Sequence, residues 1–206
     1  MDEGYIKFRC EWRKTEKTDQ TFVDALNIWR KKLYDLHLIG QYENGIGFGN
    51  ISMRYKNNQF IITGSATGGF PVLDHNHYTI VTSFNYLTNT VWCTGPIKAS
   101  SESLSHAAVY EAYSGYGAVI HVHHREMWEK LLHKLPTTPE YVAFGTPQMA
   151  NAIKEILASD LCSQHKIIVM GGHEDGLLTY GKDLYEAGEV LLFWFNKIMH
   201  NSTFTH

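Results

Sequence analysis

The sequence lacks several features that would assign it to a special class of protein. No apolar run reaches the ~20 residues that a membrane span needs, and the polar first 20 residues lack the apolar centre of a signal peptide. Charged residues make up 19% of the chain and the net charge is −3, so the whole chain presents no basic excess for nucleic acid. We therefore expect a protein that binds neither membranes nor nucleic acid.

Cysteine is also scarce. The chain has three cysteines, Cys10, Cys93 and Cys162, and their spacing forms neither a disulfide framework nor a CxxC site. This usage is typical of a reducing compartment, so we expect a cytoplasmic protein.

Apolar and aromatic residues, in contrast, are plentiful. The 206 residues are 44% hydrophobic and 13% aromatic, which is enough for one folded domain and excludes a disordered chain. We expect a polar lead-in at residues 1–20 and one domain at residues 21–200.

Helices and strands are mixed along this domain. Apolar spacing predicts helices at 21–38, 101–113, 127–135, 147–158 and 184–199. Strand patterns occur at 45–55, 60–63, 78–81, 89–93, 117–123, 167–170 and 177–180. Several connections are hairpin-length, which favours an α/β domain on a largely antiparallel sheet.

The strongest chemical motif is His121-Val122-His123 at the end of an apolar strand. Residues two apart on a strand point the same way, so the two imidazoles lie side by side as a metal site requires. An isolated HxH is about as often a pair of histidines on a wet strand end. His124 points to the opposite face and is expected to be a bystander.

His173 follows a second buried strand across Gly171-Gly172. The glycines let the backbone turn tightly and bring the imidazole near a neighbouring strand end. A histidine after a strand is usually only a polar loop residue, but this one would complete a facial set of three.

Ser100, Ser101 and Glu102 open the helix at 101–113. Serines and a carboxylate at this position are also what an ordinary helix start contains, because they cap it and complement its dipole. The functional interpretation is that free amides and hydroxyls hold a phosphate and that Glu102 is a base beside it. His106, one turn further, is expected to be a hydrogen-bond partner in support.

Two small-residue stretches, 49–50 and 64–68, end or begin strands and provide amides and hydroxyls for a further anion nest. Most such glycines belong to ordinary turns. Gly45, Gly47 and Gly49 lack the GxGxxG spacing and lead into a strand, so they are no dinucleotide motif.

The ordered set GNISMR (49–54), IITGSATG (61–68), SSESLSH (100–106), AVIHVHH (118–124) and GGHEDGLLTYG (171–181) resembles the class II aldolase/adducin-like family. This resemblance implies a three-layer α/β/α domain on a mostly antiparallel sheet and a homotetramer with sites between subunits. It makes His121, His123 and His173 the ligands of a divalent ion, usually zinc, and Glu102 the catalytic acid/base. The family's phosphate-binding positions correspond to Asn50, Thr63, Gly64, Ser65, Ser100 and Ser101.

The resemblance implies a metal-dependent aldolase that cleaves or forms a carbon–carbon bond in a small sugar phosphate through a metal-stabilised enediolate. Epimerases and dehydratases of the family share this metal site, and adducin-like members serve assembly without it. The sequence departs from the family at Glu174-Asp175, which separate His173 from Gly176, and in a short 125–141 stretch without a clear proton-donating tyrosine.

Overall fold

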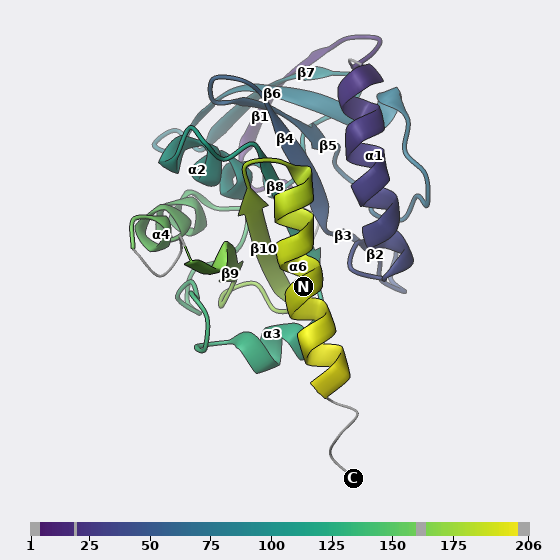
Figure 1. The fold of residues 1–206 in the computed structure, drawn as a ribbon. Coiled ribbons are helices and arrows are strands. Elements are labelled where there is room, and N and C mark those ends of the chain that lie inside the picture. The colour runs from purple at the N-terminus through teal and green to yellow at the C-terminus, as the bar shows by residue number, and fades with distance from the viewer. Residues whose placement is uncertain (1–4, 19, 160–163, 202–206) are drawn as a thin grey trace.

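The computed structural model describes residues 5–18, 20–159 and 164–201. Its centre is an eight-stranded sheet with the order β1-β7-β6-β5-β4-β8-β10-β9 (Figure 1). The strands are β1 (Arg9–Lys14), β4 (Asn50–Lys56), β5 (Gln59–Thr63), β6 (Tyr78–Asn85), β7 (Thr90–Gly95), β8 (Ala118–His123), β9 (Ile167–Val169) and β10 (Gly176–Gly181). A separate two-stranded ribbon pairs β2 (Gly40–Gln41) with β3 (Gly47–Phe48).

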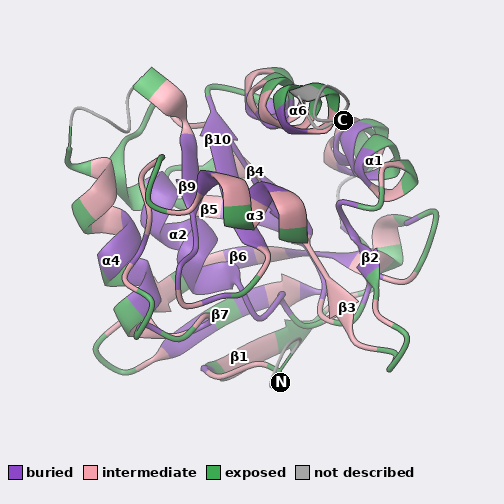
Figure 2. Ribbon diagram, turned by 90° about the horizontal axis from the view of Figure 1, so that it is seen from below, coloured by how far each residue is buried: buried purple, intermediate pink, exposed green. Residues whose placement is uncertain are grey.

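Helices lie against both faces of this sheet (Figure 2). They are α1 (Gln20–Asp35), α2 (Ser103–Ala112), α3 (Arg125–Leu131), α4 (Pro147–Leu157) and α6 (Leu184–Asn201), with a short 3-10 turn η1 (His75–His77) before β6. Helices α2 and α4 contact each other, while α6 contacts α1, α3 and the strands β8 and β10. No helix of the described residues is both long and apolar enough to cross a membrane.

Two hydrophobic cores follow from the alternation of side chains along the strands. On β8, Ala118, Ile120 and Val122 belong to the core under α1 and α6. Val119, between them, belongs to the core under α2 and α4. His121 and His123 continue the Val119 row, so the strand itself directs both imidazoles toward the α2 side.

The expected mixed α/β domain on a mostly antiparallel sheet is confirmed. Each pairing between the described strands is antiparallel except that of β1 with β7, which is parallel. Apart from the stretch at 45–55, the helices and strands predicted from periodicity are present, with ends that differ by a few residues.

Two local predictions need correction. The polar lead-in contains β1, which the sequence did not predict, and Phe8 just before it is buried in the core. The single strand expected at 45–55 is divided into β3 and β4 at Gly49, whose φ is +74°. A Cβ at Gly49 would lie 2.7 Å from the Ile39 side chain, so this break requires glycine.

The cysteines are closer in space than in sequence. Cys10 on β1 and Cys93 on β7 are free thiols whose sulfurs lie 3.7 Å apart. The hydrogen bond between the two thiols lowers the pKa of Cys93 to about 7 and raises the pKa of Cys10. Cys162 lies outside the described residues.

Candidate metal centre and active site

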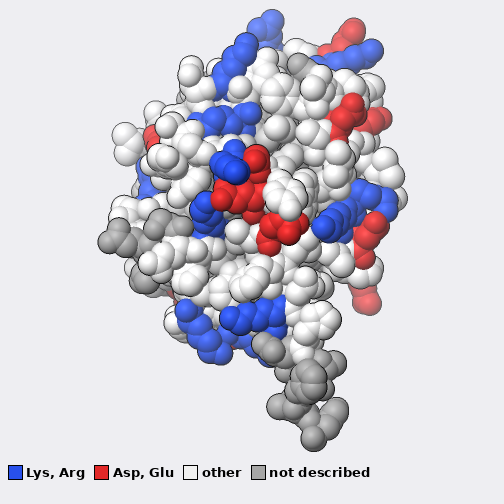
Figure 3. Space-filling view, in the orientation of Figure 1, with Lys and Arg blue, Asp and Glu red and all other residues white. Residues whose placement is uncertain are grey.

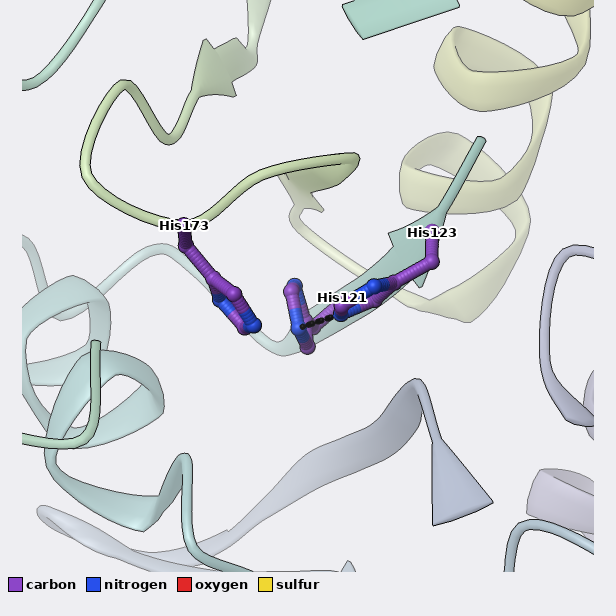
Figure 4. Close-up of side chains that lie close together, drawn as sticks. All are labelled: His121, His123 and His173. Atoms are coloured by element: carbon purple, nitrogen blue, oxygen red, sulfur yellow. Dashed lines mark hydrogen bonds between the residues drawn. The ribbon is translucent and has the colours of Figure 1, made fainter. Parts of the chain in front are cut away.

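Three buried histidines converge at one end of the sheet (Figure 4). His121 and His123 project from β8 on the same face, and His173 enters from the β9–β10 turn. Strand β10 pairs with β8 so that Gly176 lies opposite His123, which brings the turn beside the strand end. The ligand nitrogens of the three side chains all lie within 4.8 Å of one another.

The glycines before His173 make this approach possible. A Cβ at Gly171 would lie 2.2 Å from the carbonyl oxygen of Thr138, and one at Gly172 would lie 1.8 Å from that of Val142. Both distances are far inside van der Waals contact, so the turn can pack here only with glycine at both positions.

Hydrogen bonds orient the rings. The Leu177 carbonyl lies 3.1 Å from His121 Nδ1 and can only accept, so Nδ1 carries the proton and Nε2 presents a lone pair. The Tyr42 hydroxyl lies 2.9 Å from His123 Nδ1 and allows the same arrangement. The two Nε2 atoms then face each other at 3.0 Å. Such outer hydrogen bonds are typical of metal-binding histidines.

The electrostatics of the cluster also suit a cation. Burial, and after it the neighbouring His123 and His173, hold the pKa of His121 well below its ordinary value. The imidazole is therefore neutral at pH 7, the form that binds a metal. Zn–N bonds of about 2.0–2.1 Å place tetrahedral ligands about 3.3 Å apart. The nitrogen separations of this cluster, from 3.0 Å to 4.8 Å, bracket that value, so the residues fit a divalent ion.

Glu102 is buried beside the histidines and does not cap the helix in the way its sequence position suggests. It is the N-cap residue of α2, but its side chain makes no capping hydrogen bond. Its Oε2 instead accepts a hydrogen bond of 2.7 Å from Ser105 Oγ. The carboxylate is thus held in position within the site. The hydrogen bonds that cap the start of the helix come from the serines and not from the Glu102 side chain.

One small cavity, which we call the inner cavity, joins these groups. Its volume is about 30 Å³, and it is lined by Gly47, Phe48, Gly49, Asn50, Gly64, Thr67, Gly68, Ser100, Ser101, Glu102, His121, His123, Phe144 and His173. Of the residues predicted for phosphate binding, Asn50, Gly64, Ser100 and Ser101 line it. The Oδ1 atom of Asn50 is buried without a hydrogen-bond partner among the described residues, so the amide faces the cavity with unused capacity.

Thr63 and Ser65, also predicted for phosphate binding, are not among the lining residues. The Thr63 hydroxyl accepts a hydrogen bond from the Ile51 amide, which ties β5 to β4. The amide of Ser65 donates to the Lys98 carbonyl. The loop instead presents Thr67 and Gly68 to the cavity.

The remaining histidines near the motifs have structural roles. His106 Nδ1 lies 2.7 Å from Ser52 Oγ, and burial lowers the pKa of this imidazole to about 3. Its side chain therefore supports the strand, and the hydrogen bond that joins it to Glu102 is the backbone one, from the His106 amide to the Glu102 carbonyl at 3.1 Å. His124 is the N-cap of α3, where its Nδ1 accepts from the Met127 amide, in line with its expected exclusion from the site.

Phe144 is a site residue that the sequence did not indicate. Its ring stacks on His173 with a centroid distance of 4.2 Å and an interplanar angle of 18°. Phe144 and His173 also border a second space, the outer cavity, of about 690 Å³. That cavity is lined further by Tyr42, Glu43, Asn44, Ile46, Arg125, Gly172, Glu174 and Asp175. No periodicity or motif marks Phe144, because a loop places it there.

Comparison with known proteins confirms the family resemblance. Residues 40–128 match the family model described as Class II Aldolase and Adducin N-terminal domain. No curated protein matches the chain by sequence.

Similar solved structures cover nearly the whole chain. An L-fuculose 1-phosphate aldolase is 17% identical, with a TM-score of 0.65 over 92% of this chain and 90% of that one. YgbL from Klebsiella pneumoniae is 17% identical, with a TM-score of 0.66 and 91% of each chain covered. A sugar-phosphate aldolase from Thermotoga maritima is 12% identical, with a TM-score of 0.63 over 90% of this chain and 97% of that one. At these identities the likeness establishes the fold.

Proposed function

We propose that this chain, which carries the class II aldolase and adducin domain over residues 40–128, is a divalent-metal-dependent lyase acting on a small sugar phosphate. The observation that supports this proposal is the convergence of three buried histidines and one buried carboxylate on a single cavity. Members that serve only assembly have no need of such a set. The α/β/α layering expected of the family accords with the two cores on opposite faces of the sheet.

In this proposal His121, His123 and His173 hold the divalent ion, which we expect to be zinc. When bound, the ion supplies Lewis acidity that stabilises negative charge on the sugar oxygens. Three protein ligands are the number that catalytic zinc sites typically use. Tyr42 and the Leu177 carbonyl keep the His123 and His121 rings in orientation.

Glu102 moves a proton to or from the carbon next to the cleaved bond. Ser105 holds its Oε2 at 2.7 Å, so the carboxylate is oriented before substrate arrives. Ser100, Ser101, Asn50 and the Gly64–Gly68 loop hold the phosphate, which fixes the position of the reacting carbons. Phe144 over His173 limits the access of water to the site.

The proposed function also sets our expectations for assembly, environment and partners. We expect a homotetramer, a reducing cytoplasmic environment and no nucleic-acid partner. Lysine, arginine and acidic side chains are interspersed on the face shown in Figure 3, which accords with a small-molecule substrate.

The test combines metal content with product analysis. Purified wild-type protein should contain about one divalent ion per chain, and His121→Ala or His123→Ala should lose most of it because two imidazoles remain. His124→Ala is the matched control: it removes the neighbouring imidazole, should weaken the α3 cap by about 1 kcal/mol, and should keep the metal. Stoichiometric metal in both site variants would refute the ligand assignment.

A panel of ketose phosphates, assayed for cleavage, epimerisation and loss of water, then identifies the reaction. Cleavage to two carbonyl products supports the lyase. Epimerised or dehydrated product would assign one of the family's other reactions to the same residues. Absence of all three, with metal bound, would contradict a sugar-phosphate enzyme.

A further inference from the structure

The inner cavity is too small to hold a sugar phosphate by itself. Its volume of about 30 Å³ accommodates about one water molecule or one ion. The outer cavity, at about 690 Å³, has the size of an ordinary ligand site. A molecule that occupies the outer cavity and reaches the histidines extends past Phe144 and His173, which border both spaces. The groups that contact Phe144 accordingly influence which molecules enter.

One of these groups comes from the N-terminal segment. Lys7 Nζ lies 3.5 Å from the centroid of the Phe144 ring. The contact is a cation–π interaction at close range. Phe144 in turn stacks on His173. Only the Phe144 ring therefore separates Lys7 from a proposed metal ligand.

The backbone at Lys7 is held firmly. Asn89, in the turn before β7, donates its side-chain amide to the Lys7 carbonyl at 2.8 Å and accepts the Arg9 amide at 2.8 Å. The adjacent Phe8 is buried in the core. These contacts fix where the lysine side chain starts, so its reach to Phe144 is built into the fold.

The stem of Lys7 also passes the start of α2. A Cβ built at Gly145 would lie 3.2 Å from the Ser101 carbonyl, 3.5 Å from Glu102 Oε1 and 3.8 Å from Lys7 Cδ. Gly145 is therefore surrounded by Lys7, Ser101 and Glu102. The lysine lies next to the end of the cavity where the serines are expected to hold an anion.

This position matters because the inner cavity has little positive charge of its own. In the part of the chain that the structure describes, its lining contains the carboxylate of Glu102 but no lysine or arginine. Hydroxyls and amides are neutral donors, while a phosphate group carries about −1.5 to −2 charges. Even with the proposed divalent ion on the three histidines, the carboxylate of Glu102 and a phosphate of about −2 charges would leave the site with a net negative charge, and burying an unpaired charge is costly.

We propose that Lys7 is a specificity-determining residue of this site: its ammonium pairs with the anionic group of the substrate, and Phe144 is the platform that holds it at the cavity mouth. The inference rests on the proposed function for the identity of the substrate. It adds a phosphate-recognising charge contributed by a segment outside the matched family domain at residues 40–128.

The test measures binding of inorganic phosphate to the purified, metal-loaded protein by calorimetry. Lys7→Met keeps the length and the contact with the aromatic ring but removes the charge. Lys7→Arg keeps the charge. Lys56→Met is a matched control, because Lys56 also lies over an aromatic ring, 4.9 Å from that of Tyr55, at the far end of β4 from Asn50.

We expect Lys7→Met to weaken phosphate binding by about tenfold or more, the effect of losing one charge-assisted contact. Lys7→Arg and Lys56→Met should stay within about threefold of wild type. Metal content should be equal in all four proteins. With an active substrate, Lys7→Met should raise KM for the phosphorylated sugar and leave kcat nearly unchanged.

Phosphate affinity in Lys7→Met equal to that of wild type would overturn the inference, as would a wild-type protein that does not bind phosphate. Failure of the proposed function is read separately, from metal content and from the absence of turnover on the ketose-phosphate panel. A purely structural role for Lys7 predicts a lower melting temperature in Lys7→Met with unchanged phosphate affinity, which also contradicts the inference.

Discussion

Glu102 occupies a position where a carboxylate has two possible uses. At a helix start it is worth about 0.3–1 kcal/mol of stability through the dipole alone. Here it makes no capping hydrogen bond, and its Oε2 accepts a hydrogen bond from the Ser105 hydroxyl. This geometry favours the acid/base role over the helix cap.

Glu102→Gln keeps the size of the side chain and removes its charge and basic oxygen. As acid/base, Glu102 should contribute about 10²–10⁴-fold to the rate, so turnover should fall by that factor. The melting temperature should change little and the three histidines should still hold metal. Turnover, metal content and melting are measured on one preparation.

Glu111→Gln is the control for this substitution. Glu111 lies on the same helix, is exposed, and pairs with Lys154 at 3.1 Å. We expect wild-type turnover from it. Wild-type turnover in Glu102→Gln as well would remove Glu102 from the chemistry.

His106 makes a second residue-scale prediction, concerning acid. Burial lowers its pKa to about 3, whereas the unfolded chain has the ordinary value near 6.5. Between these values the unfolded state binds the extra proton, so the free energy of unfolding decreases as pH falls. The contribution of the neutral His106 side chain to the free energy of unfolding is fully present above about pH 6.5. Below that pH it declines by at most about 1.4 kcal/mol per pH unit.

His106→Gln should therefore lessen the acid sensitivity of the metal-free protein. From pH 7 to pH 5 the wild type should lose about 2 kcal/mol more than the variant, measured by urea unfolding. An equal loss in both proteins would show that the imbalance in proton binding lies elsewhere, for example at His121, whose pKa is also lowered.

At the scale of elements, helix α1 fixes the loop that lines the cavity. Arg30 is buried and donates from its guanidinium to the carbonyls of Phe70, Thr67 and Gly68. Ala66 in the same loop has a φ of +61°, an unfavourable conformation that needs such support. The position of Thr67 and Gly68 at the cavity thus depends on a side chain from a distant helix.

Arg30→Lys keeps the charge but cannot present the same fork of donors. It should leave buried carbonyls without partners and lower the free energy of unfolding by about 2–4 kcal/mol. Phosphate binding should weaken with it. Both are measured by urea unfolding and by calorimetry.

Lys31→Met, at the next residue, tests whether loss of any cation on α1 has this effect. Lys31 is exposed and pairs with Asp35 at 2.6 Å, a surface pair worth about 0.3–0.5 kcal/mol. If Arg30→Lys costs no more than this, the arginine does not hold the loop.

At the scale of the whole molecule, α6 leaves large aromatic side chains exposed on the surface. Trp194 and Phe195 are half-buried, and Phe195 packs on His124 at 5.5 Å. Phe193 is 59% exposed and Tyr185 is 67% exposed. We expect these two residues to contribute to an interface in the proposed tetramer.

Phe193→Glu should dissociate that assembly, because it introduces a charge into a contact that excludes water. Light scattering at micromolar concentration measures the mass of both proteins. Leu87→Glu, at the 99% exposed turn between β6 and β7, should leave the mass unchanged. A monomeric wild-type protein would contradict the prediction.

The sequence by itself determined the elements and the direction of the key side chains. Strand alternation is a local property, so His121 and His123 could be placed on one face from their spacing alone. The same holds for the helices, whose periodicity reports which side is buried. The ordered motifs then indicated the resemblance to the family whose model matches residues 40–128.

Only the tertiary structure decided the contacts between distant segments. The Thr67 and Gly68 positions depend on Arg30 of α1, and the Phe144 position depends on its stacking with His173. Strand β1 was missed because its residues are mostly polar and it pairs at the sheet edge with β7, a partner far along the chain. These arrangements are stabilised by packing and by hydrogen bonds between segments that are distant in sequence. Such interactions produce no periodic pattern in the sequence from which they could be predicted.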